Sequence, residues 1–121
     1  MIVPEKVDSL LTRYASRSFY DELMECGVRI HLYHGGLLHT KSICADRRIS
    51  MFGTANLDMR SLWINYEVSA FIYGEQFGAA LRTLQGSYMD DSRILDPDEW
   101  ARRSNTQRFL ENVFRLSSPV L

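Results

Sequence analysis

Hydrophobic and polar residues alternate along the middle of this chain, and this period of two predicts β-strands. The alternation covers residues 28–33, 49–52 and 66–73, and a further strand holds His39 and ends at a turn over residues 46–48. In the strand over 66–73, one face carries Glu67, and the other face is apolar. We expect both faces of this strand to be largely covered.

Apolar residues recur at helical spacing on either side of these strands. Residues 8–26 predict a helix that Asp8 caps and Gly27 ends, with a candidate break near residues 16–18. The segment 57–65 has no sustained period, so we expect an ordered loop. Residues 2–4 could be the end of a strand.

Three helices are predicted after the strands. The first follows Gly74, and its apolar stripe should pack on the sheet; the stripe consists of Phe77, Leu81, Leu84 and Tyr88. The second starts at Asp96, where an N-cap precedes a proline. The third covers residues 105–116. A helix, three or four strands and further helices together predict an α/β fold, with a mixed sheet covered by helices.

Composition limits the classes of function. With 121 residues, 45% of them hydrophobic, the chain has the size of one domain, over residues 1–121, with one core. A formal net charge of -1 produces no field that would gather nucleic acid, so we expect no nucleic-acid partner. No stretch approaches the roughly 20 apolar residues of a membrane span, so we expect this chain by itself to be soluble. Cys26 and Cys44 lack CxxC spacing and are interpreted as buried thiols.

The residues with the clearest chemistry are His39 and Lys41. In an extended strand they project from the same side, about 6 to 7 Å apart along the chain. An imidazole can attack phosphorus or pass a proton near neutral pH, and a lysine holds anionic oxygens. Together with Asp46 they form the pattern HxKx4D, which indicates phosphoryl chemistry. A strand with a histidine and a lysine on its polar face is the alternative interpretation of the pair.

Two later features favour the chemical interpretation. Residues 53–56 supply a glycine, the hydroxyl of Thr54 and the amide of Asn56, where a backbone must approach a ligand closely. Further on, Glu67 could orient a histidine through one ring nitrogen and leave the other nitrogen free. If the strand of Glu67 neighbours the strand of His39, we expect the two side chains to form a hydrogen bond.

These residues resemble the second HKD motif of the phospholipase D superfamily, in order and in spacing. Within it, the chain is most similar to the bacterial cardiolipin synthases, judged by residues 15–20, 55–61 and 65–68. Such enzymes carry two HKD motifs and usually hydrophobic N-terminal segments, whereas this chain holds one motif and no such segment. The resemblance therefore implies a phospholipase D-like half-domain that is incomplete at its N-terminus, a C-terminal fragment of a larger enzyme.

The resemblance also implies roles for individual residues. The catalytic set is His39, Lys41, Asp46 and Glu67, and the phosphate-binding set is Lys41, Thr54, Asn56 and Arg60. His39 is expected to act as general acid toward glycerol and then as general base, while the first motif forms the phosphohistidine. Asp46 stands at a hairpin turn, which favours a structural role for it. Arg60 could equally pair with Asp58.

The implied activity is that of a phosphatidyltransferase, which joins two phosphatidylglycerol molecules into cardiolipin and releases glycerol. Its implied partners are the phospholipid substrate and the missing N-terminal HKD half, its implied location is the bacterial inner membrane, and no cofactor or metal is expected. Two alternatives stay open: a phosphodiesterase or nuclease that completes its site as a homodimer, and a catalytically incomplete fragment that binds phosphate. His31 and His34 should point away from each other, which disfavours a metal site.

Overall fold

A computed structural model describes residues 1–7, 10–56 and 59–116, except for the side chains of Leu11, Met59 and Arg60. Its strands form two three-stranded sheets, in the orders β1-β2-β6 and β3-β4-β5. The strands are β1 (Ile2–Pro4), β2 (His31–Tyr33), β3 (Lys41–Ala45), β4 (Ile49–Gly53), β5 (Ser69–Tyr73) and β6 (Ser92–Ile94). The α/β class is confirmed, and the sheet that we expected to be continuous is divided into two.

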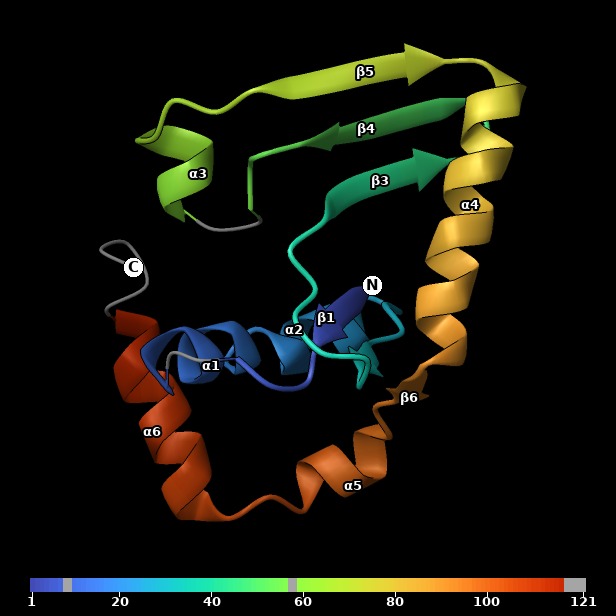
Figure 1. The fold of residues 1–121 in the computed structure, drawn as a ribbon. Helices are drawn as coiled ribbons and strands as arrows, with labels where there is room; N and C mark the ends of the chain where they lie inside the picture. Colours follow the sequence, from blue (N-terminus) through green and yellow to red (C-terminus); the bar gives the residue numbers. More distant parts are fainter. Residues whose placement is uncertain (8–9, 57–58, 117–121) are drawn as a thin grey trace.

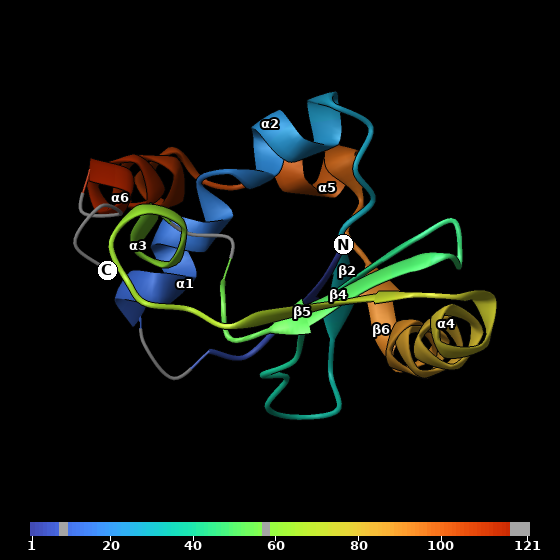
Figure 2. The same ribbon diagram turned by 90° about the horizontal axis from the view of Figure 1, so that it is seen from above.

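One helix connects the two sheets, and another lies at the end of the second sheet (Figure 1). The helices are α1 (Leu10–Arg17), α2 (Tyr20–Glu25), α3 (Met59–Trp63), α4 (Glu75–Asp90), α5 (Pro97–Ala101) and α6 (Asn105–Leu116). Helix α4 runs from the end of β5 to the start of β6, and α3 lies at the opposite end of the β3-β4-β5 sheet (Figure 1). Seen from above, α1 and α6 lie on the side of the molecule away from α4 (Figure 2).

The hydrophobic core lies beside the first sheet, in which β1 runs parallel and β6 antiparallel to β2. It consists of the buried residues Tyr20, Ile30, Leu32, Leu95 and Trp100. The side chain of Asp96 accepts a hydrogen bond from the N–H of Asp98 at 2.8 Å, which caps α5 as predicted. This cap positions the start of the helix that carries Trp100 into the core.

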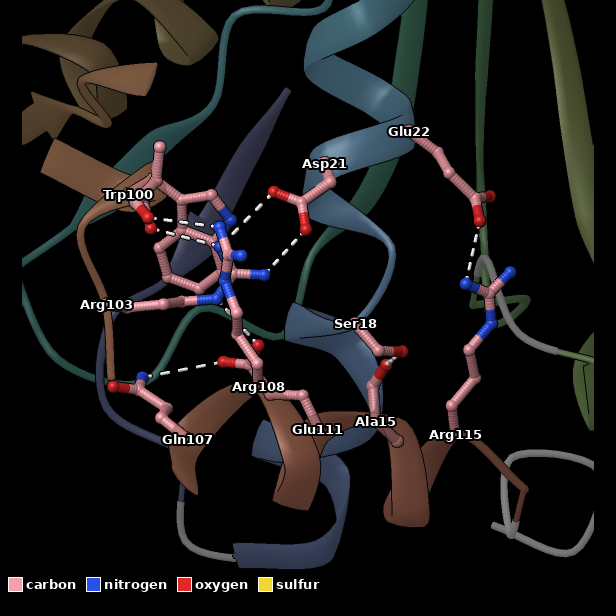
Figure 3. A network of polar contacts seen from close by, with 11 residues as sticks. Ala15, Ser18, Asp21, Glu22, Trp100, Arg103, Gln107, Arg108, Glu111 and Arg115 are labelled. Atoms are coloured by element: carbon pink, nitrogen blue, oxygen red, sulfur yellow. Dashed lines mark hydrogen bonds and ion pairs between the residues drawn. The ribbon is translucent and has the colours of Figure 1, made fainter. Parts of the chain in front are cut away.

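A partly buried ion-pair network joins residues of α2 and α6 with Arg103, which follows α5 (Figure 3). The guanidinium of Arg103 donates to Glu111 at 2.9 Å and to both oxygens of Asp21, at 2.6 and 3.3 Å. It also stacks on the Trp100 ring, with 4.3 Å from its central carbon to the ring centroid. The side chain of Glu111 is 1% exposed, so this carboxylate depends on Arg103 for its charge balance.

The second sheet is an antiparallel meander built on the hairpin of β3 and β4. Asp46 and Arg47 both have positive φ, 51° and 57°, and the N–H of Arg48 donates to the carbonyl of Ala45 at 3.0 Å. Two successive positive φ values characterise the type I′ turn, whose twist matches that of a hairpin. The turn predicted over residues 46–48 is confirmed.

Helix α4 covers one face of this sheet and leaves the other face open. On the covered face, Cys44 reaches the carbonyl of Gly78 at 3.5 Å, and Gln85 donates to Ser42 at 3.1 Å. On the other face, Ile43 and Phe71 are exposed. Our expectation that both faces of the 66–73 strand would be covered is therefore wrong, because a single helix crosses this sheet.

Several local predictions also need correction. Residues 59–63 form a helix where we expected a loop, because a single helical turn is too short to produce a periodic pattern. The apolar stripe of α4, which we expected to pack on the sheet, is partly exposed at Phe77 and Leu84. Cys26, which we expected to be buried, is exposed. The break between α1 and α2 is confirmed, and the cap predicted at Asp8 lies outside the described residues.

Candidate active site

Four of the sequence-predicted site residues, His39, Lys41, Thr54 and Glu67, lie at one end of the β3-β4-β5 sheet. Lys41, Gly53 and Ser69 pair across the three strands in the last register position at this end. His39 precedes β3 by two residues, and Thr54 directly follows β4. The ends of three different strands therefore bring together residues that are far apart in sequence.

The structure gives His39 and Lys41 a direct contact. The ammonium nitrogen of Lys41 lies 2.7 Å from Nε2 of His39, and it also donates to the carbonyl of His39 at 3.0 Å. An ammonium only donates, so Nε2 of His39 is the acceptor in this contact. A phosphate that attracted the ammonium of Lys41 would free Nε2 for chemistry.

A second contact joins the ends of β4 and β5. The hydroxyl of Thr54 donates to the Glu67 carboxylate and accepts from the N–H of Val68 at 3.0 Å. The N–H of Thr54 donates to the carbonyl of Val68, also at 3.0 Å. A Cβ on Gly53 would collide with that same carbonyl, so the glycine permits the close approach. The sequence did not predict a role for Val68. It acts through its backbone N–H and carbonyl, and backbone groups carry no sequence signal.

These contacts revise two predictions. Strand β4 lies between β3 and β5, so the premise that the strand of Glu67 neighbours the strand of His39 is wrong. A hydroxyl has one proton, and Thr54 gives it to Glu67, so in this structure that proton is not directed at a ligand. The hydrogen bond between Glu67 and His39 stays a prediction.

The remaining predicted residues are only partly placed. Asn56 is exposed, two residues beyond Thr54. The side chain of Arg60 and all of Asp58 lie outside the description. Asp46 stands at the far end of β3. With a rise of about 3.3 Å per residue, the strand separates it from Lys41 by about 16 Å along the chain. The structure therefore separates Asp46 from His39 and Lys41, in agreement with its predicted place at the hairpin turn.

The other histidines lie near the first sheet. Nδ1 of His34 lies 2.6 Å from a carboxylate oxygen of Glu5. Burial lowers the pKa of His31, helped by the nearby N-terminal amino group. In the part of the chain that the structure describes, no three metal-binding side chains come together.

A separate cavity lies elsewhere in the fold. It has a volume of about 630 Å³ and is lined by residues of the Arg103 network, among them Asp21 and Glu111. Three of the charged side chains on its walls, Asp21, Arg103 and Glu111, already pair with one another. The His39–Lys41 pair stands outside this cavity, on an open surface.

Comparison with known proteins decides the family. A family model described as "Cardiolipin synthase, PLD-like domain" matches residues 1–85. The chain belongs to this family. Its membership confirms the resemblance to the phospholipase D superfamily that the HKD motif indicated.

Among relatives of this PLD-like chain is cardiolipin synthase A of Erwinia tasmaniensis, which is 47% identical over 121 residues, all of this chain and 25% of the relative. The protein of the same name from Wigglesworthia glossinidia brevipalpis is 46% identical over the whole chain and 24% of its own length. That of Cronobacter sakazakii is 48% identical, again over the whole chain and 25% of its length. No solved structure matches the chain.

The PLD-like chain thus spans about a quarter of the length of these relatives. Within the described residues, no helix has the length and apolar character that crossing a membrane requires.

Proposed function

We propose that this chain supplies one half of the active site of a phosphatidyltransferase that makes cardiolipin. Two observations support the proposal: its relatives are named cardiolipin synthase A, and the contact between His39 and Lys41 provides the parts for phosphoryl transfer. The second half of the site would come from another HKD motif in the complete protein.

The proposed reaction has two steps. A histidine of the other motif attacks the phosphorus of one phosphatidylglycerol and forms a phosphohistidine, while His39 gives a proton to the departing glycerol oxygen. The hydroxyl of a second phosphatidylglycerol then attacks the same phosphorus and gives its proton to His39. Cardiolipin leaves, both histidines are regenerated, and protons balance over the cycle.

Lys41 has a separate role in this scheme. Its ammonium moves from Nε2 of His39 to the non-bridging phosphate oxygens, where it balances their charge. Asn56 is proposed to add an amide donor, and Arg60 a second cation. Thr54 holds Glu67 between β4 and β5, and a phosphate would receive its proton only if that hydrogen bond were exchanged.

Analysis of the reaction products tests the proposed function. The complete protein that contains this chain should convert phosphatidylglycerol vesicles into equal amounts of cardiolipin and glycerol, measured by mass spectrometry. Formation of phosphatidic acid without cardiolipin would indicate a hydrolase. Cleavage of an oligonucleotide, with phosphatidylglycerol untouched, would indicate the nuclease alternative.

A further inference from the structure

The side chain of Ser69 lies on the open face of the second sheet, level with Lys41. Ser69 pairs with Gly53 across β5 and β4, and Gly53 pairs with Lys41 across β4 and β3. Figure 1 shows β4 between the two outer strands. Cross-strand partners present their side chains on the same face of a sheet, so Lys41 and Ser69 stand on either side of the glycine.

Gly53 leaves space between these two side chains. A Cβ at this position would lie 2.8 Å from the hydroxyl oxygen of Ser69, so that oxygen lies beside the empty place above the glycine. Adjacent strands are about 4.8 Å apart, which puts the Cα atoms of Lys41 and Ser69 about 10 Å from each other. A phosphate group over Gly53 would therefore reach both side chains.

The hydroxyl of Ser69 is available to a ligand. Ser69 is exposed, and within the part of the chain that the structure describes no hydrogen bond engages its hydroxyl. Thr54, which we expected to supply a hydroxyl to the phosphate, gives its proton to Glu67 instead. Ser69 can therefore donate to an anion without first breaking a hydrogen bond, whereas Thr54 cannot.

The charges at this end of the sheet favour a phosphate over Gly53. The Glu67 carboxylate lies two residues before Ser69 and accepts the proton of Thr54, beyond the last residue of β4. It would repel a phosphate, and more strongly the closer the two came. The ammonium of Lys41 attracts a phosphate on the opposite side of the glycine. It lies 2.7 Å from Nε2 of His39, so a phosphate held there is also next to the histidine.

We propose that Ser69 is a substrate-binding residue, whose hydroxyl donates to one non-bridging oxygen of a phosphodiester while Lys41 holds another from the far side of Gly53. The inference rests on the proposed function for the identity of that phosphodiester. It assigns the hydroxyl donor to a residue outside the HKD pattern. Because this hydrogen bond forms in the substrate complex as well as in the transition state, its loss affects KM more than kcat.

Titration with inorganic phosphate tests the donor in the chain itself. The NMR signals of the Gly53 N–H and of the Lys41 side chain report binding. Ser69→Ala should raise the dissociation constant about tenfold, as expected for loss of one hydrogen bond to a charged group. Ser69→Thr restores a hydroxyl and should recover most of the affinity. Both variants should melt at nearly the wild-type temperature, because Ser69 is exposed.

Ser42→Ala is the matched control for this titration. Ser42 is next to Lys41 on β3, but its side chain lies on the covered face, where it accepts a hydrogen bond from Gln85 at 3.1 Å. This variant should bind phosphate with the wild-type dissociation constant. An unchanged dissociation constant in Ser69→Ala, equal losses in Ser69→Ala and Ser42→Ala, or absence of any phosphate response in the wild type would overturn the inference.

A second titrant identifies the part of the lipid that Ser69 contacts. Dihexanoyl phosphatidylglycerol, which has short acyl chains, should lose affinity for Ser69→Ala by the same factor as inorganic phosphate. Equal factors would support a contact with the phosphate that the two titrants share. A loss for the lipid alone would assign Ser69 to the glycerol or the acyl chains and would overturn the inference.

Kinetics of the complete protein separate failure of this inference from failure of the proposed function. In cardiolipin formation from phosphatidylglycerol, Ser69→Ala should raise KM about tenfold and leave kcat nearly unchanged. Wild-type KM and kcat in Ser69→Ala would overturn the inference and leave the proposed function intact. Phosphate binding that depends on Ser69, in a complete protein that makes no cardiolipin, would support Ser69 as a phosphate ligand and count against the proposed function.

Discussion

Replacement of Arg103 by methionine should be among the most damaging single changes outside the candidate active site. The substitution keeps much of the packing volume but removes the partner of Glu111, whose side chain is 1% exposed. Among the contacts of the described residues, the Gln107 amide nitrogen remains 3.5 Å from the carboxylate. Loss of one partner from a buried ion pair costs about 3–5 kcal/mol, a large share of the stability of a domain of this size.

The same network predicts a rescue. In Arg103→Met/Glu111→Leu no charge is left buried by these two residues, so the double variant should regain most of the roughly 3–5 kcal/mol that Arg103→Met loses. Arg48→Met is a matched control, because Arg48 pairs with Glu75 on the surface, where both side chains are more than 70% exposed. Loss of such a pair should cost under about 1 kcal/mol.

Urea unfolding, followed by the fluorescence of Trp100, measures these three variants and Glu111→Leu alone. The probe is local, because the Arg103 guanidinium stacks on the Trp100 ring. A free energy of unfolding for Arg103→Met within about 1 kcal/mol of the wild type would refute the argument. So would a double variant as unstable as the sum of Arg103→Met and Glu111→Leu.

Three further predictions address the site and its supports. Gly53→Ala should lower the melting temperature and weaken the response of the site to phosphate, because the added Cβ collides with the backbone ahead of β5; an unchanged thermal scan and NMR titration would contradict this. Asp46→Ala should cost about 1–2 kcal/mol, because alanine tolerates positive φ poorly; urea unfolding checks the loss, and the phosphate titration should not change. Burial of Glu5 acts to raise its pKa, but hydrogen bonds from Arg93 and His34 outweigh it and lower the pKa below the ordinary 4.5. Its contribution to stability is therefore present above pH 4.5 and lost as the pH falls through the folded-state value, so Glu5→Gln should flatten the acid limb of the stability curve; an identical acid limb in both proteins would refute the pairing.

The elements with strong local signals could be predicted from the sequence. The turn at Asp46 and the cap at Asp96 depend on residues within a few positions of each other, and the structure confirms both. Helix α6 likewise has the predicted bounds, because its apolar residues repeat over three turns. The short α3 and the three-residue β6 have no such repeat, and they form through tertiary contacts that a single sequence does not reveal.

One contact of the candidate site could be predicted from the sequence, whereas the arrangement of its strands could not. The motif placed His39 and Lys41 together, and their 2.7 Å contact agrees with it. The order of the strands could not be read from spacing, so β4 was not expected between His39 and Glu67. The hydrogen bond from Thr54 to Glu67 follows from that strand order. It directs the hydroxyl proton of Thr54 to the carboxylate of Glu67.

The central claim is that His39 moves a proton in the transfer of a phosphatidyl group. The most direct measurement is the rate of cardiolipin formation from phosphatidylglycerol vesicles by the complete protein, compared between His39→Asn and His34→Asn. The control makes the same substitution at a histidine that pairs with Glu5 beside the first sheet. The account predicts a loss of about 10²-fold or more for His39→Asn, with unchanged circular dichroism, and a near-normal rate for His34→Asn. A folded His39→Asn protein that makes cardiolipin at the wild-type rate would contradict the account.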